Sequence, residues 1–368
     1  MSEEKRTYRF MISGGGTGGH IYPAISIAQA LKATLANVEI LFVGAEGRME
    51  MKKVPEAGFK IEGLWISGIQ RKITVDNLSL PFKVIASIRK SFRLIREFNP
   101  DVVIGVGGYA SGPLLYAATR RKIPTLIQEQ NSYAGLTNKW LSKRVDKICV
   151  AYDGLEKYFP KDKLVLTGNP VRLDIQQENR DAAFGYFNLD PNKKTILALG
   201  GSLGARTINQ SILKHLDALK SNDVQVVWQT GGFYHQNIVE QLDRDDYPGI
   251  RIHDFIREMQ YAYNVADLVI SRAGALSIAE LMIMGKATIL VPSPNVAEDH
   301  QTLNAKALVK KEAAVMVKDA EAENELIPTA LKTLQDEAKL ASLKTQIGAL
   351  AKPKAAYDIA NEVIKMAV

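Results

Sequence analysis

The run Gly14-Gly15-Gly16-Thr17-Gly18-Gly19-His20 contains the residues that most plainly point to chemistry. Five glycines in six positions allow a tight turn that a ligand can approach without meeting a Cβ atom. The amides that open the following helix lie at its positive end, so the loop suits a diphosphate. His20 places a side chain of the type that titrates near neutral pH beside this anion site. The alternative is an ordinary tight turn with a capping histidine.

A second group of polar residues follows another strand-like run. The apolar residues 125–127 lead into Gln128-Glu129-Gln130-Asn131. Ligands of parallel α/β sheets bind beyond the carboxyl ends of the strands, so we expect Glu129 and Asn131 to face the ligand. The alternative for both residues is ordinary turn and helix-cap chemistry.

The second half of the chain repeats the strand-and-glycine pattern. The run 195–199 leads into Gly200-Gly201-Ser202-Leu203-Gly204-Ala205, as the first strand leads into the first glycine loop. Further on, Gly274-Ala275 resembles a helix N-terminus built for phosphate, and Glu280, one turn in, could accept both hydroxyls of a ribose. The alternative is a capping box, because Ser277-x-x-Glu280 fits that pattern.

Two acidic segments raise the question of a metal. Glu298-Asp299-His300-Gln301 could read sugar hydroxyls, could be solvated, or could ligate a metal through His300. The single Asp-x-Asp, Asp243-Arg244-Asp245, follows no strand and is interpreted as a solvated turn. We therefore expect neither a metal site nor a cofactor.

The first loop also fits a dinucleotide fingerprint through Gly14, Gly16 and Gly19. In that fingerprint an acidic residue at the end of the second strand binds a ribose. Here Glu39 falls at the start of that strand and Glu46 follows it in a loop. A nicotinamide-dependent oxidoreductase therefore remains an alternative.

The elements that must position these residues follow an alternating plan. Apolar β-rich runs alternate with helical patterns, which predicts parallel sheets built from βαβ units in an α/β protein. The restart near residue 195 and the length of 368 residues indicate two doubly wound domains. Besides a first strand before Gly14, the predicted strands are 39–43, 102–106, 125–128, 147–150, 195–199, 224–228, 268–271 and 288–291.

Composition limits the function classes. Hydrophobic residues make up 46% and charged residues 24% of the chain, which is typical of a globular protein. The single cysteine, Cys149, excludes a disulfide framework and fits a reducing cytosol. The stretch 102–119 lacks charge but contains glycines and a proline, so we interpret it as strand, loop and helix. The net charge of +7 suits anionic partners, yet no zinc-ligand spacing or ribonucleoprotein motif favours nucleic acid.

Taken together, these motifs carry a resemblance. The first glycine loop continued by Ile21-Tyr22-Pro23-Ala24 resembles the opening signature of the MurG family of N-acetylglucosaminyltransferases. The other signatures follow in the same order over nearly the whole chain: Gln128-Glu129-Gln130-Asn131, Gly168-Asn169-Pro170-Val171-Arg172, Gly200-Gly201-Ser202-Leu203-Gly204-Ala205 and Ser271-Arg272-Ala273-Gly274-Ala275.

The resemblance implies a GT-B fold, with two Rossmann-like domains facing a cleft. We expect residues 1–172 to form the acceptor and membrane-side domain and 173–352 the UDP-sugar domain. A C-terminal helix at about 353–368 is expected to pack back on the first domain.

The resemblance also implies an activity: inverting transfer of N-acetylglucosamine from UDP-N-acetylglucosamine to the C4 hydroxyl of the muramoyl sugar of undecaprenyl-linked lipid I. The product, lipid II, serves peptidoglycan synthesis, and the enzyme would be peripheral on the cytoplasmic face of the cell membrane. Alternatives of the same architecture are a UDP-N-acetylglucosamine 2-epimerase and a glycolipid glycosyltransferase. A non-enzymatic membrane module would have no use for His20.

The family's residue roles fall on matching positions. From the chemistry of inversion, His20 is the leading candidate for the general base, because histidine suits proton transfer near neutral pH, and Glu129 would be a substitute or a partner that orients the histidine or the acceptor. Arg172 and Ser202 would approach the diphosphate, Ile256 would meet uracil through its backbone, and Gln301, beside His300, would read the sugar. The remaining donor contacts would be Thr17, Gly18, Gly19, Asn131, Ala275, Leu276, Ser277, Ile278, Ala279 and Glu280, the last on the ribose hydroxyls.

The segment 81–98 mixes basic and large apolar residues, including Lys83, Arg89 and Lys90. One interpretation is a core-packed helix with a solvated basic face. The other is an anionic membrane site, in which the cations pair with headgroups. The apolar residues expected to touch lipid are Ile66, Ile69, Leu78, Leu80 and Phe82.

Overall fold

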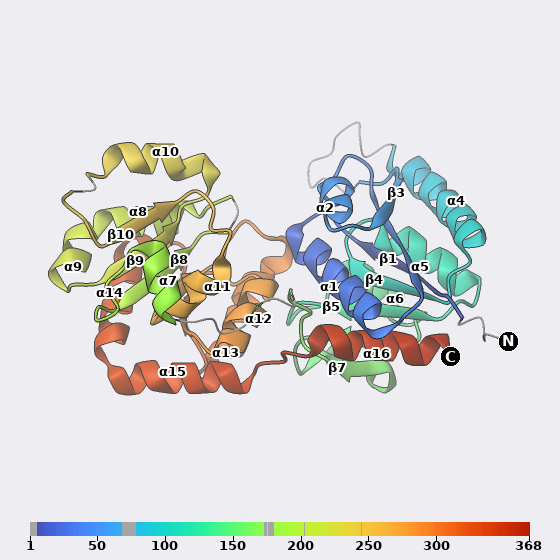
Figure 1. Cartoon of the computed structure of the whole chain (residues 1–368). Helices are drawn as coiled ribbons and strands as arrows, with labels where there is room; N and C mark the ends of the chain where they lie inside the picture. Colours follow the sequence, from blue (N-terminus) through green and yellow to red (C-terminus); the bar gives the residue numbers. More distant parts are fainter. Residues whose placement is uncertain (1–5, 68–78, 173–174, 176–179, 202, 244) are drawn as a thin grey trace. The chain divides into compact units, whose positions relative to one another are not determined.

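The computed structural model describes residues 6–67, 79–172, 175, 180–201, 203–243 and 245–368. The chain divides into two compact units, each with its own parallel sheet (Figure 1). Unit 1 comprises Met1–Leu173 and Lys352–Val368, and unit 2 comprises Asp174–Ala351. The prediction of two Rossmann-like α/β domains is confirmed.

The sheet of unit 1 has seven strands in the order β3-β2-β1-β4-β5-β6-β7, all parallel. Strand β1 lies in the interior of the sheet, where Phe10 is opposite Ile40 of β2 and Val102 of β4. The strands are β1 (Tyr8–Gly14), β2 (Val38–Ala45), β3 (Lys60–Leu64), β4 (Val102–Gly107), β5 (Thr125–Glu129), β6 (Lys147–Val150) and β7 (Leu164–Leu166).

Helices cover both faces of this sheet, because successive side chains of a strand point to opposite faces. Phe10 and Ile12 pack in a cluster with α1 and α16, whereas Met11 packs on the other face with α4 and α5. The helices are α1 (Gly18–Thr34), α2 (Glu50–Glu56), α4 (Leu80–Phe98), α5 (Ser111–Arg120), α6 (Leu136–Leu141) and α16 (Ala355–Ala367), with short 3₁₀ turns η1 (Leu155–Lys157) and η2 (Lys161–Lys163). Strand β4, its glycine loop and α5 confirm the interpretation of 102–119.

The sheet of unit 2 repeats this arrangement with six parallel strands in the order β10-β9-β8-β11-β12-β13. They are β8 (Thr195–Leu199), β9 (Gln225–Gln229), β10 (Ile250–His253), β11 (Leu268–Ser271), β12 (Ala287–Leu290) and β13 (Val315–Met316). The helices are α7 (Arg180–Phe187), α8 (Arg206–Lys214), α9 (Leu216–Ser221), α10 (Gly232–Gln241), α11 (Met259–Val265), α12 (Ala275–Met284), α13 (His300–Val309), α14 (Ala322–Gln335) and α15 (Glu337–Ala349), with the 3₁₀ turn η3 (Ala297–Asp299).

Both sheets reverse their strand order at one point, between β1 and β4 in unit 1 and between β8 and β11 in unit 2. The loops that leave two such neighbouring strands diverge and leave a crevice, which is where open α/β sheets bind their ligands. The topology therefore marks the loops after β1, β4, β8 and β11 as the places for function.

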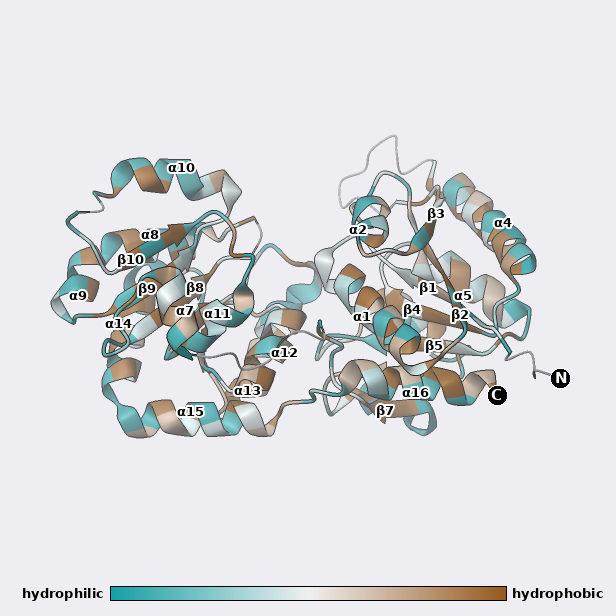
Figure 2. Ribbon diagram, in the orientation of Figure 1, coloured by the Kyte–Doolittle hydropathy of each residue, from teal (hydrophilic) through white to brown (hydrophobic). Residues whose placement is uncertain are grey.

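Helix α4 has one buried face, and Figure 2 shows hydrophobic and hydrophilic residues alternating along it. Its outer face exposes Phe82 (69%) and Ile85 (51%). The prediction that Ile66 contacts lipid is wrong, since only 8% of that residue is exposed. Leu80 is half-buried. Ile69 and Leu78, also expected to touch lipid, lie outside the described residues.

Among the helices that the structure describes, none has the length and apolar character needed to cross a membrane.

The single cysteine provides a test of the unit 1 core. Cys149 is buried on β6 in the cluster that also contains α16, and burial raises the pKa of its thiol to about 12. We expect iodoacetamide at pH 8 to alkylate the native protein at least about a hundredfold more slowly than the guanidinium-unfolded protein, because only the thiolate reacts. Intact mass resolves a single adduct. Equal rates in both states would contradict the assigned packing.

Candidate functional site

The glycine loop after β1 is organised around a carboxylate. Gly16 has a positive φ of 82° and donates its amide to Oε2 of Glu50 at 2.9 Å. The amide of Gly16 is therefore engaged by Glu50, and the anion interpretation rests on the amides that open the following helix. A carboxylate in this place also repels a pyrophosphate, which disfavours the dinucleotide alternative. The amides of Gly18 and Gly19 open helix α1, where first-turn amides lack intrahelical partners.

His20 is held from two sides within unit 1. Its Nδ1 lies 3.1 Å from the carbonyl oxygen of Gly15 and 3.5 Å from Oγ1 of Thr17. Because a carbonyl can only accept, the contact with Gly15 assigns the proton to Nδ1 and the lone pair of the neutral ring to Nε2. On the other side the ring lies against Gly107, where a Cβ atom would come within 2.8 Å of Nε2. This geometry suits a base that accepts a proton at Nε2.

The loops after β1 and β4 approach each other backbone to backbone. Gly108 has a φ of 89°, and a Cβ on it would lie 2.4 Å from the carbonyl oxygen of Gly15. Only glycine permits both this conformation and this distance. The glycine cluster at 105–113, to which sequence reasoning gave no role, thus shapes the setting of His20.

Glu129 lies buried at the end of β5 and accepts several hydrogen bonds. Its oxygens accept from the amide of Asn131 at 3.1 Å, the amide of Gly135 at 3.0 Å and Nδ2 of Asn138 at 2.9 Å. The carboxylate thereby fixes the turn that carries Asn131. These contacts favour a positioning role for Glu129 over that of a substitute base.

Buried amides join the segments that carry Asn131 and Arg172. Nε2 of Gln128 donates to Oδ1 of Asn169 at 3.1 Å, and Nδ2 of Asn169 donates to the carbonyl of Gln130 at 2.9 Å. The segments 128–131 and 168–172 therefore lie side by side, with Arg172 half-buried at the end of the second. Gln128 and Asn169 belong to the family signatures, but the resemblance gave no physical reason for them. The reason is that buried polar groups need hydrogen-bond partners, and these two amides supply partners to each other and to the backbone.

In unit 2, the loops after β8 and β9 meet in the same way as the two loops of unit 1. A Cβ on Gly204, whose φ is 81°, would lie 2.2 Å from the carbonyl oxygen of Thr230. Ser202, expected at the diphosphate, lies outside the described residues.

Gln229 at the end of β9 links this glycine loop to the segment expected at uracil. Its Nε2 donates to the carbonyl of Gly201 at 3.1 Å, and its Oε1 accepts from the amide of Ile256 at 2.9 Å. Because Gln229 already takes the amide of Ile256, a uracil ring that meets this backbone would donate a hydrogen bond to the carbonyl of Ile256. Sequence reasoning missed Gln229, whose one signal is a polar residue closing an apolar strand.

Helix α12 begins at Ala275 with Gly274 as its N-cap, so the capping-box alternative for Ser277 is wrong. Ser277 is instead the third residue of the helix, in its first turn. Ala275, Ile278 and Ala279 are buried, and only their backbones could face a ligand. Leu276, Ser277 and Glu280 are half-buried. The helix thus offers first-turn amides to an anion, as the phosphate interpretation requires.

Glu280 is oriented by a neighbouring helix. The buried Tyr263 of α11 donates its hydroxyl to Oε2 of Glu280 at 2.7 Å. A carboxylate held by a rigid donor keeps one orientation, which favours paired acceptance from vicinal hydroxyls. Sequence reasoning missed this tyrosine, which no local pattern marks.

The polar segment before and within α13 is tied to the loop after β12. Gln301 accepts the amide of Ser293 on its Oε1 at 2.9 Å, and His300 begins the helix. In the described part of the chain, no cluster of three or more His, Cys, Asp or Glu side chains is placed to hold a metal. Asp243 and Asp245 are exposed, and the amide of Asp245 donates to Oδ1 of Asp243, which confirms the turn interpretation.

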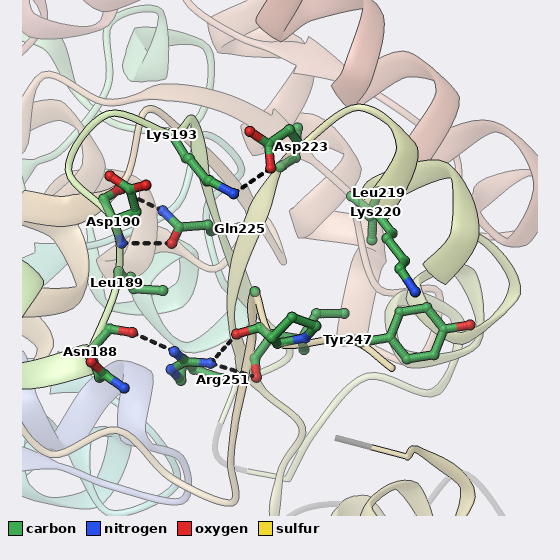
Figure 3. Close-up of a pocket in the computed structure, with 14 residues that line it drawn as sticks. Asn188, Leu189, Asp190, Lys193, Leu219, Lys220, Asp223, Gln225, Tyr247 and Arg251 are labelled. Carbon is green, nitrogen blue, oxygen red and sulfur yellow. Dashed lines mark hydrogen bonds and ion pairs between the residues drawn. The ribbon is translucent and has the colours of Figure 1, made fainter. Parts of the chain in front are cut away.

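A pocket of about 500 Å³ lies at the opposite, amino-terminal ends of β9 and β10 (Figure 3). Its charged groups are engaged within the protein: Lys193 pairs with Asp223 at 2.5 Å, and Arg251 donates to the carbonyl of Phe187 at 2.8 Å. The residues expected at the functional site all lie elsewhere, so this pocket is distinct from that site.

Curated relatives match the chain over nearly its full length. Two, from Parabacteroides distasonis and Cytophaga hutchinsonii, are each 55% identical over 365 residues, covering 98% and 99% of this chain and 99% and 98% of theirs. Both bear the name UDP-N-acetylglucosamine–N-acetylmuramyl-(pentapeptide) pyrophosphoryl-undecaprenol N-acetylglucosamine transferase.

Solved structures agree. The crystal structure of Acinetobacter baumannii MurG matches with a TM-score of 0.79 and 29% identity, over 97% of this chain and 99% of that one. A UDP-GlcNAc 2-epimerase from Neisseria meningitidis, at 15% identity and a TM-score of 0.67, over 98% of this chain and 100% of that one, shares the fold alone.

Two family models cover most of the chain. The glycosyltransferase family 28 N-terminal domain matches residues 10–150, and the C-terminal domain of the same family matches residues 195–363. The resemblance to MurG drawn from the motifs is thus confirmed, and the chain belongs to glycosyltransferase family 28.

Proposed function

We propose that the chain transfers N-acetylglucosamine from UDP-N-acetylglucosamine to the C4 hydroxyl of the muramoyl sugar of lipid I. Inversion at the anomeric carbon gives lipid II for peptidoglycan synthesis. The observation that carries the proposal is the near-full-length match to relatives whose name states this donor and acceptor. The geometry of the two sets of loops is consistent with it.

The donor nucleotide binds unit 2. The amides that open α12 face the diphosphate, Glu280 takes the ribose hydroxyls in the orientation set by Tyr263, and the Ile256 carbonyl accepts from uracil. Gln301 reads the sugar. As the glycosidic bond breaks, negative charge develops on the departing UDP, and preoriented amides stabilise such charge without reorganising. Arg172 supplies a cation to the same diphosphate.

The acceptor is activated by His20 of unit 1. In a single displacement, the C4 hydroxyl loses its proton as its oxygen bonds to the anomeric carbon. Nε2 of His20 receives that proton, because Nδ1 is directed to the Gly15 carbonyl. Glu129 positions Asn131 at the edge of this site. Thr17, Gly18 and Gly19 line the sugar donor from the glycine loop.

The activity is tested with labelled UDP-N-acetylglucosamine and a lipid I analogue, which should yield a labelled lipid-linked disaccharide and UDP. Conversion of the donor in the absence of the lipid would instead indicate epimerase chemistry and contradict the proposal.

The first prediction concerns the base. His20→Ala should lower kcat by about 10²- to 10⁴-fold, the range for loss of a general base. Calorimetric UDP binding should stay unchanged, because the nucleotide binds unit 2. His215→Ala is the matched control, since this unit 2 histidine also places Nδ1 on a carbonyl, that of Ser211 at 2.9 Å. If His20→Ala had a kcat close to that of the control, His20 would not be the general base.

The second prediction concerns the ribose. Tyr263→Phe should weaken UDP binding by about tenfold, because Glu280 loses a charge-assisted hydrogen bond that orients it. Glu280→Ala should weaken it further. Tyr261→Phe removes a hydroxyl from the same helix, where Tyr261 packs on Tyr186, and should bind UDP normally. If the Tyr263→Phe variant bound UDP as tightly as this control, the assignment of Tyr263 as the residue that orients Glu280 toward the ribose would be wrong.

We also propose that the outer face of α4 places the enzyme, as a peripheral protein, on the anionic cytoplasmic face of the cell membrane. Phe82 and Ile85 are exposed there and Arg89 is exposed beside them. Lys90 is less suited to headgroups, because its ammonium lies 3.7 Å from the carboxylates of both Glu46 and Glu62. Each surface cation contributes about 1 kcal/mol to binding an anionic bilayer.

The third prediction tests this face. Combined Phe82→Ser and Ile85→Ser should reduce co-sedimentation with phosphatidylglycerol vesicles about tenfold or more, because two large apolar side chains no longer enter the bilayer. UDP binding should persist. Phe233→Ser in α10, where Phe233 is 84% exposed, is the control for removing an exposed aromatic ring. Equal sedimentation of the double variant and the control would place the membrane contact elsewhere.

A further inference from the structure

Glu50 is a buried carboxylate outside every motif considered so far. It is the first residue of α2, and only 1% of it is exposed. Oε2 accepts from the amide of Gly16 at 2.9 Å, and Oε1 accepts from the amide of Ala45 at 3.0 Å. A buried carboxylate is unfavourable unless it is hydrogen-bonded, and here two backbone donors satisfy it. The side chain thus ties the end of β2 to the glycine loop.

The backbone around Glu50 is shaped to admit it. A Cβ on Gly15 would lie 2.2 Å from Oε1 of Glu50, and a Cβ on Gly44 would lie 2.6 Å from its Cγ. The carboxylate therefore fills the space that side chains at these two positions would occupy. Gly15 is in direct contact with Glu50 on one side, and its carbonyl contacts Nδ1 of His20 on the other.

We propose that Glu50 is a positioning residue for His20. By holding the peptide units of Gly15 and Gly16, it keeps the Gly15 carbonyl on Nδ1 and the lone pair of the ring on Nε2. It acts through the loop and does not touch substrate. The catalytic consequence rests on the proposed role of His20 as base, whereas the effect on the histidine ring does not.

Glu50→Gln is the sharpest test, because glutamine keeps the shape but replaces one acceptor with an NH₂ donor. One of the two backbone amides then faces a donor, and the loop must shift. We expect kcat to fall by about tenfold to a hundredfold, as for a misplacement of about 1 Å at a catalytic group. Calorimetric binding of UDP should stay within about twofold, because UDP lacks the sugar that the glycine loop lines and the nucleotide binds unit 2.

Glu56→Gln is the matched control. Glu56 ends the same helix but pairs on the surface with Lys53 at 2.8 Å. Its kcat should equal that of the wild type. A Glu50→Gln variant as active as this control would overturn the catalytic part of the proposal.

A double-variant cycle separates positioning from general damage. In a His20→Ala background, Glu50→Gln should lower kcat by less than about twofold, because its target is already gone. A full second loss in the double variant would show that Glu50 supports the fold without acting through His20.

Histidine ¹⁵N NMR gives a readout independent of activity. The His20 signals, identified by their absence in His20→Ala, should show a protonated Nδ1 and an unprotonated Nε2 at pH 8. Glu50→Gln should give a mixture of tautomers, and an unchanged spectrum would overturn the proposal. If His20→Ala proved fully active, the base assignment would fail while this spectrum still decided the role of Glu50.

If Glu50→Gln does not fold, as judged by its thermal transition, Gly44→Ala replaces it. The added methyl group would meet Cγ of Glu50 and displace the carboxylate without removing its charge. The same fall in kcat and the same mixed tautomers are expected, and wild-type values for both would reject the proposal.

Discussion

Close approach of glycine backbones between the loops of neighbouring strands is the constraint on which the candidate site depends. In unit 1 the carbonyl of Gly15 lies where a side chain of Gly108 would be, and in unit 2 the carbonyl of Thr230 lies where a side chain of Gly204 would be. Such contacts bring the backbone amides and carbonyls of two loops close together. Any larger residue would separate the loops and with them the polar groups they carry.

These glycine-rich loops need side chains from other segments to hold one conformation, because glycine confers no rigidity of its own. Glu50 does this in unit 1, where it accepts the amide of Gly16, and Gln229 does it in unit 2, where it donates to the carbonyl of Gly201. Each of these two side chains makes two hydrogen bonds to backbone groups, Glu50 with the amides of Gly16 and Ala45 and Gln229 with Gly201 and Ile256. The charged residue thus holds the loop that carries His20, the proposed base, and the neutral one holds the segment proposed to meet uracil.

The interior strands were predictable from sequence and the edge strands were not. Every predicted strand, from 39–43 to 288–291, appears in the sheets, because interior strands are buried on both faces and read as apolar runs. The missed strands, β3, β7, β10 and β13, are the four sheet edges. Strands β7 and β13 have only three and two residues, and β3 and β10 carry charge, as Lys60 and Glu62 do in β3, so none of the four forms a long apolar run.

The candidate site divides in the same way. His20, Gly274 and Glu280 stood out because glycine loops and helix starts leave local patterns. Glu50, Gln229 and Tyr263 did not, because their partners lie 34, 28 and 17 residues away and only the folded chain brings them together. Local pattern identified the groups that are proposed to face a ligand, while the groups that hold them depend on tertiary contacts.

The position of α16 in the sequence, after unit 2, has a consequence for folding during synthesis on the ribosome. Ile359 and Val363 of α16 are fully buried against α1, so unit 1 lacks part of its core until this helix, which follows unit 2 in the sequence, has been synthesised. Unit 2 is continuous in sequence and has all its residues earlier. Although domains emerge N-terminal first, the unit that begins the chain is therefore the last to be completed. Until then, the apolar face of α1 that packs against α16 stays exposed, and chaperones could bind it.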